Sequence, residues 1–190
     1  MSDALDAVLQ ELLHSDTPIL VVLAGSNGAG KTTFYRRVLG DLLPFVNADE
    51  IGRALDPEAP QADPYAAARL ADLVRRDLIA HRRSFCMETV FSDPAGEKLQ
   101  FLRTAQLAGY RVVFVWIRID SVELSMARVQ QRVDAGGHDV PDEKLVTRFD
   151  RTARNAREAL TFVDLGLVLD NSEVDRPFRH LETWRSGQRI

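Results

Sequence analysis

One short motif restricts the fold of this chain more than any other feature, because it works only where a buried strand turns into a helix. Residues 25–32 read Gly-Ser-Asn-Gly-Ala-Gly-Lys-Thr and match the phosphate-loop pattern G-x-x-x-x-G-K-[ST]. The apolar run 18–24 before them is typical of a buried parallel strand, and a helical pattern follows over 31–39. We therefore predict a site for nucleotide phosphates at the turn between this strand and this helix.

Each residue type in the motif has a physical task. The glycines let the backbone wrap around phosphates with several N–H groups pointing inward. Lys31 is expected to reach the β- and γ-phosphates, and the Thr32 hydroxyl to bind Mg²⁺. An LSGGQ-like ABC signature and an N-K-x-D guanine reader are both missing from the sequence. The sequence thus predicts ATP and Mg²⁺ as cofactors, with a nucleotide-binding set of Gly25, Ser26, Asn27, Gly28, Ala29, Gly30, Lys31, Thr32 and Thr33.

Strand and helix patterns alternate along the rest of the chain. Strand patterns lie at 18–24, 45–47, 84–87, 112–117 and 167–169, and helical patterns at 1–16, 31–39, 65–83, 94–108, 120–133, 141–162 and 174–184. Such alternation predicts an α/β fold with a parallel sheet. We expect a single P-loop NTPase domain over 1–190, a three-layer sandwich with a five-stranded, mostly parallel sheet. It would be similar to nucleoside-monophosphate kinases, with a helical lid spanning residues 120–162.

Composition and charge narrow the classes of partner. The 24 basic and 28 acidic residues give a net charge of -4, which argues against broad binding to nucleic acid. Cys86 is the sole cysteine, so the chain cannot form an internal disulfide and suits a reducing compartment. Asp3 and Asp6 stand where a signal peptide would be basic, and the apolar runs are too short to span a membrane. We expect a cytoplasmic protein without nucleic-acid or membrane partners.

Carboxylates follow two of the predicted strands. In parallel α/β sheets ligands lie at the carboxyl ends of strands, which places Asp49 and Glu88 at the functional edge. We assign Asp49 as the general base on an acceptor hydroxyl, with helix capping as the alternative. Glu88 is a candidate to hold Mg²⁺ through water or to grip the acceptor, and otherwise a solvated strand end. Thr89 beside it is a candidate substrate contact.

Arginines concentrate in the predicted lid. Lys31, Lys98 and Lys144 are the only lysines among the 24 basic residues, so the other cations are arginines. Arg128 and Arg132 lie four apart on one helix, a spacing at which like charges repel unless an anion or water separates them. We interpret them as catalytic residues that close on the phosphates, against the alternative of two solvated helices. Arg148 and His138 are candidate substrate contacts.

Asn171 follows the predicted fifth strand, near the expected position of the nucleotide base. A contact to adenine and capping of the predicted last helix are equally open there.

The chain resembles the zeta-toxin-like P-loop kinases of bacteria in five segments taken together: residues 24–33, 47–50, 88–92, 136–141 and 170–172. This resemblance implies transfer of phosphate from ATP, with Mg²⁺, to a hydroxyl of UDP-N-acetylglucosamine, together with a toxin role and an antitoxin partner. It implies that Asp49 is the catalytic base and Glu88 the acidic residue of the substrate site. Larger family members place the substrate-binding threonine further from the glutamate than Thr89 is here. A second hypothesis is a nucleotide-dependent ATPase switch that binds a partner protein.

Overall fold

The most apolar runs of the sequence form the centre of the sheet. The computed structural model describes residues 3–40, 42–56, 64–137 and 139–190. β1 (Ile19–Ala24) is buried along its whole length and pairs in parallel with β3 (Phe85–Thr89) on one side and β4 (Arg111–Arg118) on the other. A strand with neighbours on both edges and helices on both faces has no polar side, which explains its unbroken run of apolar residues.

The sheet has the order β2-β3-β1-β4-β5-β6-β7. The five parallel strands match the predicted ones, with β2 at Phe45–Val46 and β5 at Leu165–Asp170. Two antiparallel strands, β6 (Arg179–Arg185) and β7 (Gln188–Arg189), extend it to seven, so the predicted total of five is wrong.

The predicted helix over 174–184 is also wrong, because most of this segment is β6. Leu181 and Trp184 both pack against the core, and their spacing of three suggests a helical face. The pairing of β5 with β6 shifts register between Val168 and Leu169, where Val168 faces Glu182 and Leu169 faces His180. The extra residue of this β-bulge is Leu181, and the bulge lets both apolar side chains turn inward from a strand.

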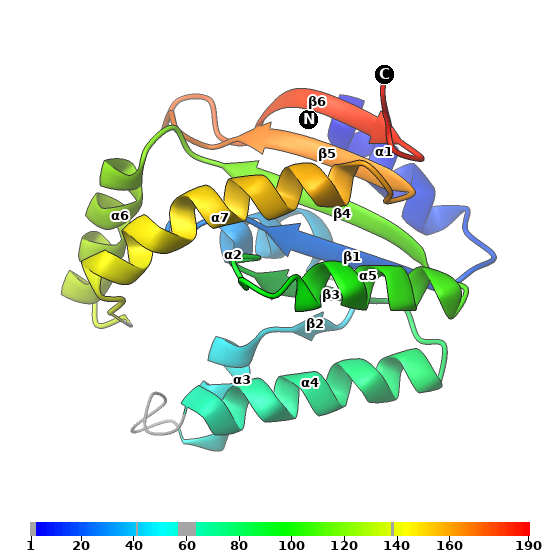
Figure 1. Cartoon of the computed structure of the whole chain (residues 1–190), viewed down its shortest axis with the longest axis horizontal. Coiled ribbons are helices and arrows are strands. Elements are labelled where there is room, and N and C mark those ends of the chain that lie inside the picture. Colours follow the sequence, from blue (N-terminus) through cyan, green and yellow to red (C-terminus); the bar gives the residue numbers. More distant parts are fainter. Residues whose placement is uncertain (1–2, 41, 57–63, 138) are drawn as a thin grey trace.

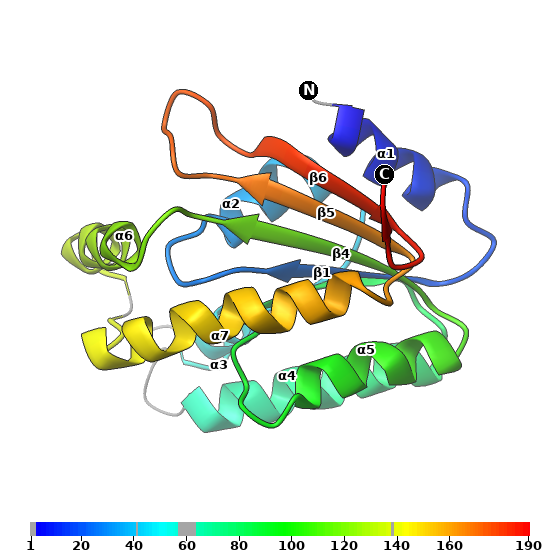
Figure 2. The same cartoon turned by 45° about the horizontal axis from the view of Figure 1, so that its top comes forward.

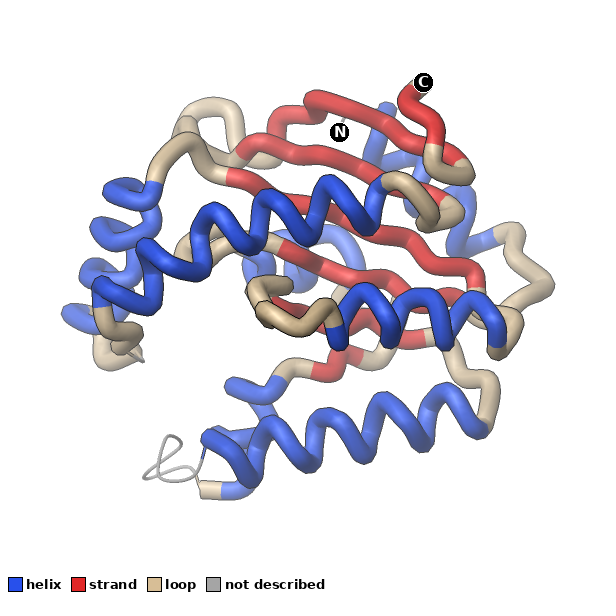
Figure 3. Tube along the Cα trace, in the orientation of Figure 1, coloured by secondary structure: helices blue, strands red, loops and turns tan. Residues whose placement is uncertain are grey.

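Helices cover both faces of the sheet, as Figures 1 and 2 show. α5 (Glu97–Leu107) and α7 (Asp142–Leu160) lie on one face, and α1 (Asp3–Leu13) and α2 (Lys31–Phe34) on the other. α2 continues as a short π-helix, η1 (Tyr35–Leu39). In Figure 3 the strands, in red, form one layer, with helices, in blue, in front of it and behind it. The predicted three-layer sandwich is therefore confirmed.

Three further helices lie along the β2 edge of the sheet or beyond the carboxyl ends of its parallel strands (Figure 1). α3 (Ala48–Leu55) and α4 (Pro64–Ala80) pack together beside β2. α6 (Val122–Asp134) and the first half of α7 project beyond the sheet and share a small apolar core of Val129, Val140 and Leu145. The N-cap of α6 is Ser121, whose hydroxyl accepts from Leu124 N at 3.2 Å. Within the described ranges, each helix is too short or too polar to cross a membrane.

Candidate active site

The phosphate loop connects β1 to α2 and adopts a backbone that needs glycine at two positions. Gly28 has φ +73° and Gly30 φ +91°, in the left-handed region where a side chain is strained. Gly28 also lies against α6, where a Cβ atom would come within 2.9 Å of the Cβ of Arg128. α2 begins at Lys31, so the positive end of its backbone dipole faces the loop.

Lys31 is buried beneath this loop, with 6% of its surface exposed. Its Nζ donates to the carbonyls of Gly25 at 2.9 Å and Ser26 at 3.0 Å. Burial lowers the pKa of Lys31, while the charges of Glu88 and Asp49 raise it and that of Arg132 lowers it further. Both predicted carboxylates and one predicted arginine therefore lie within electrostatic range of the ammonium.

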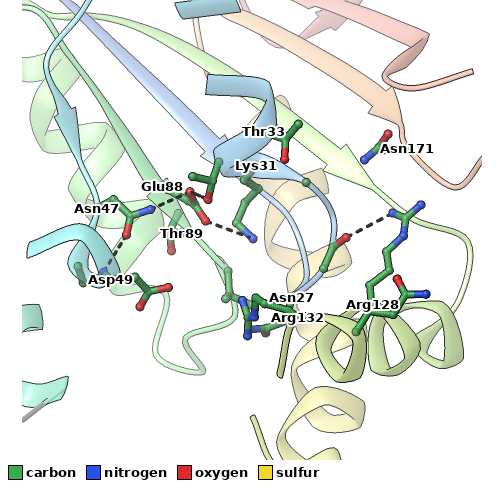
Figure 4. A pocket seen from close by; sticks show the side chains of 16 residues that line it. Asn27, Lys31, Thr33, Asn47, Asp49, Glu88, Thr89, Arg128, Arg132 and Asn171 are labelled. Carbon is green, nitrogen blue, oxygen red and sulfur yellow. Dashed lines mark hydrogen bonds and ion pairs between the residues drawn. The ribbon is translucent and has the colours of Figure 1, made fainter. Parts of the chain in front are cut away.

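Glu88 is the centre of a polar network at the end of β3. Its Oε2 accepts a hydrogen bond from the Thr32 hydroxyl at 2.7 Å and another from the Asn47 amide at 2.9 Å. Its Oε1 lies 3.8 Å from Lys31 Nζ. Figure 4 shows the carboxylate between the Asn47 amide and the Lys31 ammonium. The predicted Mg²⁺ residues Thr32 and Glu88 are thus direct neighbours although 56 positions separate them in sequence.

Asn47 has no predicted site role, yet it organises two parts of the site. Its Oδ1 accepts from Asp49 N at 2.7 Å and Glu50 N at 3.3 Å, which makes Asn47 the N-cap of α3. The capping alternative for Asp49 is therefore wrong, and Asp49 lies in the first turn of α3 with its side chain lining the pocket. The sequence signal for Asn47 was its position directly after β2 and before a helix, a usual place for a capping amide.

The pocket around these groups has a volume of about 650 Å³. It opens at the carboxyl ends of β1, β2 and β3, bounded by α3 on one side and α6 on the other. Its lining contains most of the predicted site residues: Asn27, Gly28, Gly30, Lys31, Thr32, Thr33, Asp49, Glu88, Thr89, Arg128, Arg132 and Asn171. Four residues without a predicted role also line it: Asn47, Ala48, Val90 and Gln131. In Figure 4 Asp49 lies on the opposite side of this pocket from Arg128.

The predicted lid arginines occupy different places. Arg132 lines the pocket from α6. Arg128 also lines the pocket, but its guanidinium donates to the carbonyls of Gly28 at 3.3 Å and Ser172 at 3.2 Å. Arg148 is not among the lining residues, and His138 lies outside the described part of the chain.

The loop after β3 is held by α7. The Thr152 hydroxyl donates to Val90 O at 2.8 Å, and the Asn155 amide to Phe91 O at 3.1 Å and Asp93 O at 3.0 Å. Thr89 lines the pocket, and its hydroxyl oxygen accepts from Phe91 N at 3.0 Å. The flank of α7 that contains Asn155 therefore fixes the backbone beside the pocket.

Asn171 is engaged with protein groups. Its Nδ2 donates to Ala29 O at 2.9 Å, and its Oδ1 accepts from Phe178 N at 3.3 Å. Because β6 replaces the predicted last helix, helix capping by Asn171 is excluded. A contact from its side chain to adenine would use the second N–H of Nδ2 or the second lone pair of Oδ1.

The oxygen ligands at the site suit a hard cation. Mg²⁺ commonly binds one or two protein oxygens and completes an octahedron with water and phosphate oxygens. The Thr32 hydroxyl and the Glu88 carboxylate supply such oxygens next to the phosphate loop. Among the described residues there is no cluster of three or more His, Cys, Asp or Glu side chains that would suit a metal held by protein alone.

The family model of the zeta toxins matches residues 3–188. The chain belongs to the zeta toxin family. This match confirms the resemblance carried by the sequence motifs and the phosphotransferase class that it implies. The family's substrates and partners are not thereby assigned to this chain.

Individual relatives of this zeta toxin family member are distant. An uncharacterized protein of Haemophilus influenzae is 27% identical over 129 residues, which are 68% of this chain and 91% of that protein. A structure of the AvrRxo1-ORF1:-ORF2 complex with ATP has a TM-score of 0.76 at 18% identity, covering 98% of this chain and 65% of that one. The PezAT toxin–antitoxin system of Streptococcus pneumoniae gives a TM-score of 0.64 at 18% identity, covering 96% and 81%. At these identities the two structures establish the fold, and this chain spans about two thirds of the matched chain of the AvrRxo1-ORF1:-ORF2 complex.

Proposed function

We propose that this protein is an ATP- and Mg²⁺-dependent kinase that transfers the γ-phosphoryl group of ATP to a hydroxyl of a small molecule. The observation that carries the proposal is the network of Thr32, Glu88 and Asn47 beside the buried Lys31, with Asp49 separate from it in the same pocket. Phosphoryl transfer needs cations and N–H donors for the phosphates, oxygens for Mg²⁺, and a base for the acceptor. The pocket brings together a candidate for each of these groups.

In the proposed reaction the phosphate loop and Lys31 bind the phosphate chain of ATP. The acceptor hydroxyl oxygen forms a bond to the γ-phosphorus, and the bond from that phosphorus to the β–γ bridging oxygen breaks. The electron pair leaves with ADP, and the hydroxyl proton passes to the Asp49 carboxylate. Arg132 supplies positive charge on the α6 side of the pocket.

Thr32 and Glu88 would hold Mg²⁺, with the Asn47 amide orienting the carboxylate. When bound, Mg²⁺ would neutralise charge on the phosphate oxygens. The protein's own part is to keep the two oxygens at one place beside the loop.

For the acceptor, UDP-N-acetylglucosamine is the first candidate, because it is the substrate that the family resemblance implies. A hydroxylated metabolite of another class would use the same base. A toxin role in the bacterial cytoplasm and an antitoxin partner are part of the proposal, supported by family membership and by the likeness to a structure from a toxin–antitoxin system.

The test is to incubate the protein with ATP, Mg²⁺ and either UDP-N-acetylglucosamine or a metabolite extract, and to analyse the products by mass spectrometry. We expect one acceptor to gain a single phosphate, and expect no product from Lys31→Ala. If the wild type and Lys31→Ala give the same product spectrum, the kinase proposal is wrong. If Asp49→Asn retains nucleotide-dependent binding of a partner protein and the wild type transfers no phosphate, the ATPase switch is favoured instead.

A further inference from the structure

Side chains from several elements bond to the carbonyls of the phosphate loop. The carbonyls of residues 25–29 each accept a hydrogen bond from a side chain: Gly25 and Ser26 from Lys31, Asn27 from Ser125, Gly28 from Arg128, and Ala29 from Asn171. These donors come from α2, from α6 and from the segment after β5. No sequence motif connects Ser125 or Asn171 to the loop.

These bonds determine where the loop N–H groups point. In a planar trans peptide the carbonyl of one residue and the N–H of the next point in opposite directions, and all described peptides here are trans. The bond from Ser125 to Asn27 O therefore directs Gly28 N–H away from α6. The bond from Asn171 to Ala29 O likewise directs Gly30 N–H away from the Asn171 side chain. Within the described ranges, neither N–H has a backbone acceptor, so both are available to a ligand.

Ser125 makes the shortest of these contacts. Its hydroxyl donates to Asn27 O at 2.7 Å, across 98 positions of sequence, and the residue is 1% exposed. A serine inside a helix often bonds a carbonyl of its own preceding turn. This hydroxyl instead contacts the phosphate loop, at the point where α6 lies closest to Gly28.

We propose that Ser125 is a positioning residue that holds the phosphate loop in its nucleotide-binding shape and couples α6 to it. This inference rests on the proposed function, since it assumes that the loop binds nucleotide phosphates. Without the hydroxyl, the Asn27 carbonyl loses its side-chain donor, which favours rotation of its peptide toward another partner. Rotation would turn Gly28 N–H away from the phosphates and weaken nucleotide binding.

A matched pair of variants isolates the hydroxyl. Ser125→Thr and Ser125→Val add side chains of nearly equal shape, and only threonine retains the donor. We expect the Val variant to bind ADP in the presence of Mg²⁺ about tenfold more weakly than the Thr variant, the usual size of one lost buried hydrogen bond. Ser125→Ala, which adds no volume, should also bind about tenfold more weakly than wild type. Isothermal titration calorimetry at a temperature where all variants are folded measures both comparisons.

The calorimetric data also separate positioning from loss of structure. Irreversibly unfolded protein lowers the number of binding sites per molecule, while the remaining sites keep the wild-type dissociation constant. Reversible unfolding raises the apparent dissociation constant only by the reciprocal of the folded fraction, which is close to one where the variants are folded. Thr104→Ala is the control, because its exposed hydroxyl bonds only Gln100 O of its own helix. Equal dissociation constants for the Thr and Val variants, or for Ser125→Ala and wild type, would overturn the proposal and leave the kinase function intact. Failure of the wild type itself to bind ADP would overturn both.

Discussion

The Thr32 hydroxyl donates a 2.7 Å hydrogen bond to Oε2 of Glu88, which joins the end of the phosphate loop to the end of β3. In the proposed function these two oxygens would share one Mg²⁺ with the phosphates of ATP. Thr32 lies in the first turn of α2, which the phosphate loop connects to β1, and Glu88 lies in β3, the parallel neighbour of β1. The contact therefore follows from the topology.

If these oxygens hold Mg²⁺, then Glu88→Gln removes the negative charge of the Glu88 side chain but keeps the shape of that side chain. We expect kcat to fall about a hundredfold or more, and the Mg²⁺ concentration for half-maximal activity to rise. A titration of phosphoryl transfer against Mg²⁺ measures both. A variant with unchanged Mg²⁺ dependence would place the metal elsewhere.

Asn47 allows its two roles to be separated. Asn47→Asp keeps an oxygen that can cap α3 but loses the amide that donates to Glu88, and it adds a second carboxylate there. We expect this variant to keep most of its thermal stability and lose activity. Asn47→Ala loses the cap as well and should cost about 1 kcal/mol in the free energy of unfolding. The opposite order, with Asn47→Asp the less stable variant, would contradict this division of roles.

Asp49 has a neighbouring carboxylate that serves as a control. Glu50 lies in the same first turn of α3 but is ion-paired to Arg36 at 3.2 Å, on the surface. We expect Asp49→Asn to lower kcat by about 10²–10⁴, the usual contribution of a general base, with little change in melting temperature. Glu50→Gln should leave kcat within a factor of two or so of wild type. Equal effects of the two substitutions would show that Asp49 is not the base.

The burial of Lys31 is expected to lower the stability of the fold, although the proposed function needs its charge. Burial holds its pKa below the ordinary lysine value of 10.5, so folding disfavours its charged form. At neutral pH the unfolded chain therefore holds this proton more strongly than the folded one, and the free energy of unfolding should rise as pH increases toward 10.5. Lys31→Met removes the buried charge.

We accordingly expect Lys31→Met to be inactive yet to melt at least as high as the nucleotide-free wild type at neutral pH. Its advantage should shrink as the pH rises, because the wild-type ammonium then loses its proton. Thermal unfolding of both proteins across a pH series gives the comparison. A clearly lower melting temperature for Lys31→Met would mean that its bonds to Gly25 O and Ser26 O outweigh the cost of burial.

The sequence was sufficient to predict those residues of the pocket lining that belong to a local motif or to a strand end. Lys31 and Thr32 follow from the phosphate-loop pattern, and Asp49 and Glu88 from their positions after β2 and β3. Asn47, at a helix start, could have been found by the same reasoning. Ser125 could not, because its partner Asn27 is distant in sequence and the contact depends on how α6 packs against the loop.

Outside the site, the main error of sequence reasoning lies at the end of the chain. The spacing of Leu181 and Trp184 imitates a helix because a β-bulge reverses the alternation of the strand. No local propensity reveals such a bulge, since it depends on the pairing with β5. The number of strands was underestimated for the same reason.

The most direct test of the account is phosphoryl transfer itself, measured with wild type and Asp49→Asn under identical conditions. Each protein is incubated with Mg²⁺, ATP labelled in the γ-phosphate and the acceptor found in the extract screen, while ADP binding is measured in parallel by calorimetry. The account predicts labelled acceptor with the wild type, almost none with Asp49→Asn, and similar ADP affinity for both. Undiminished transfer by Asp49→Asn would contradict the assigned mechanism, and release of labelled phosphate to water alone by the wild type would contradict the kinase function.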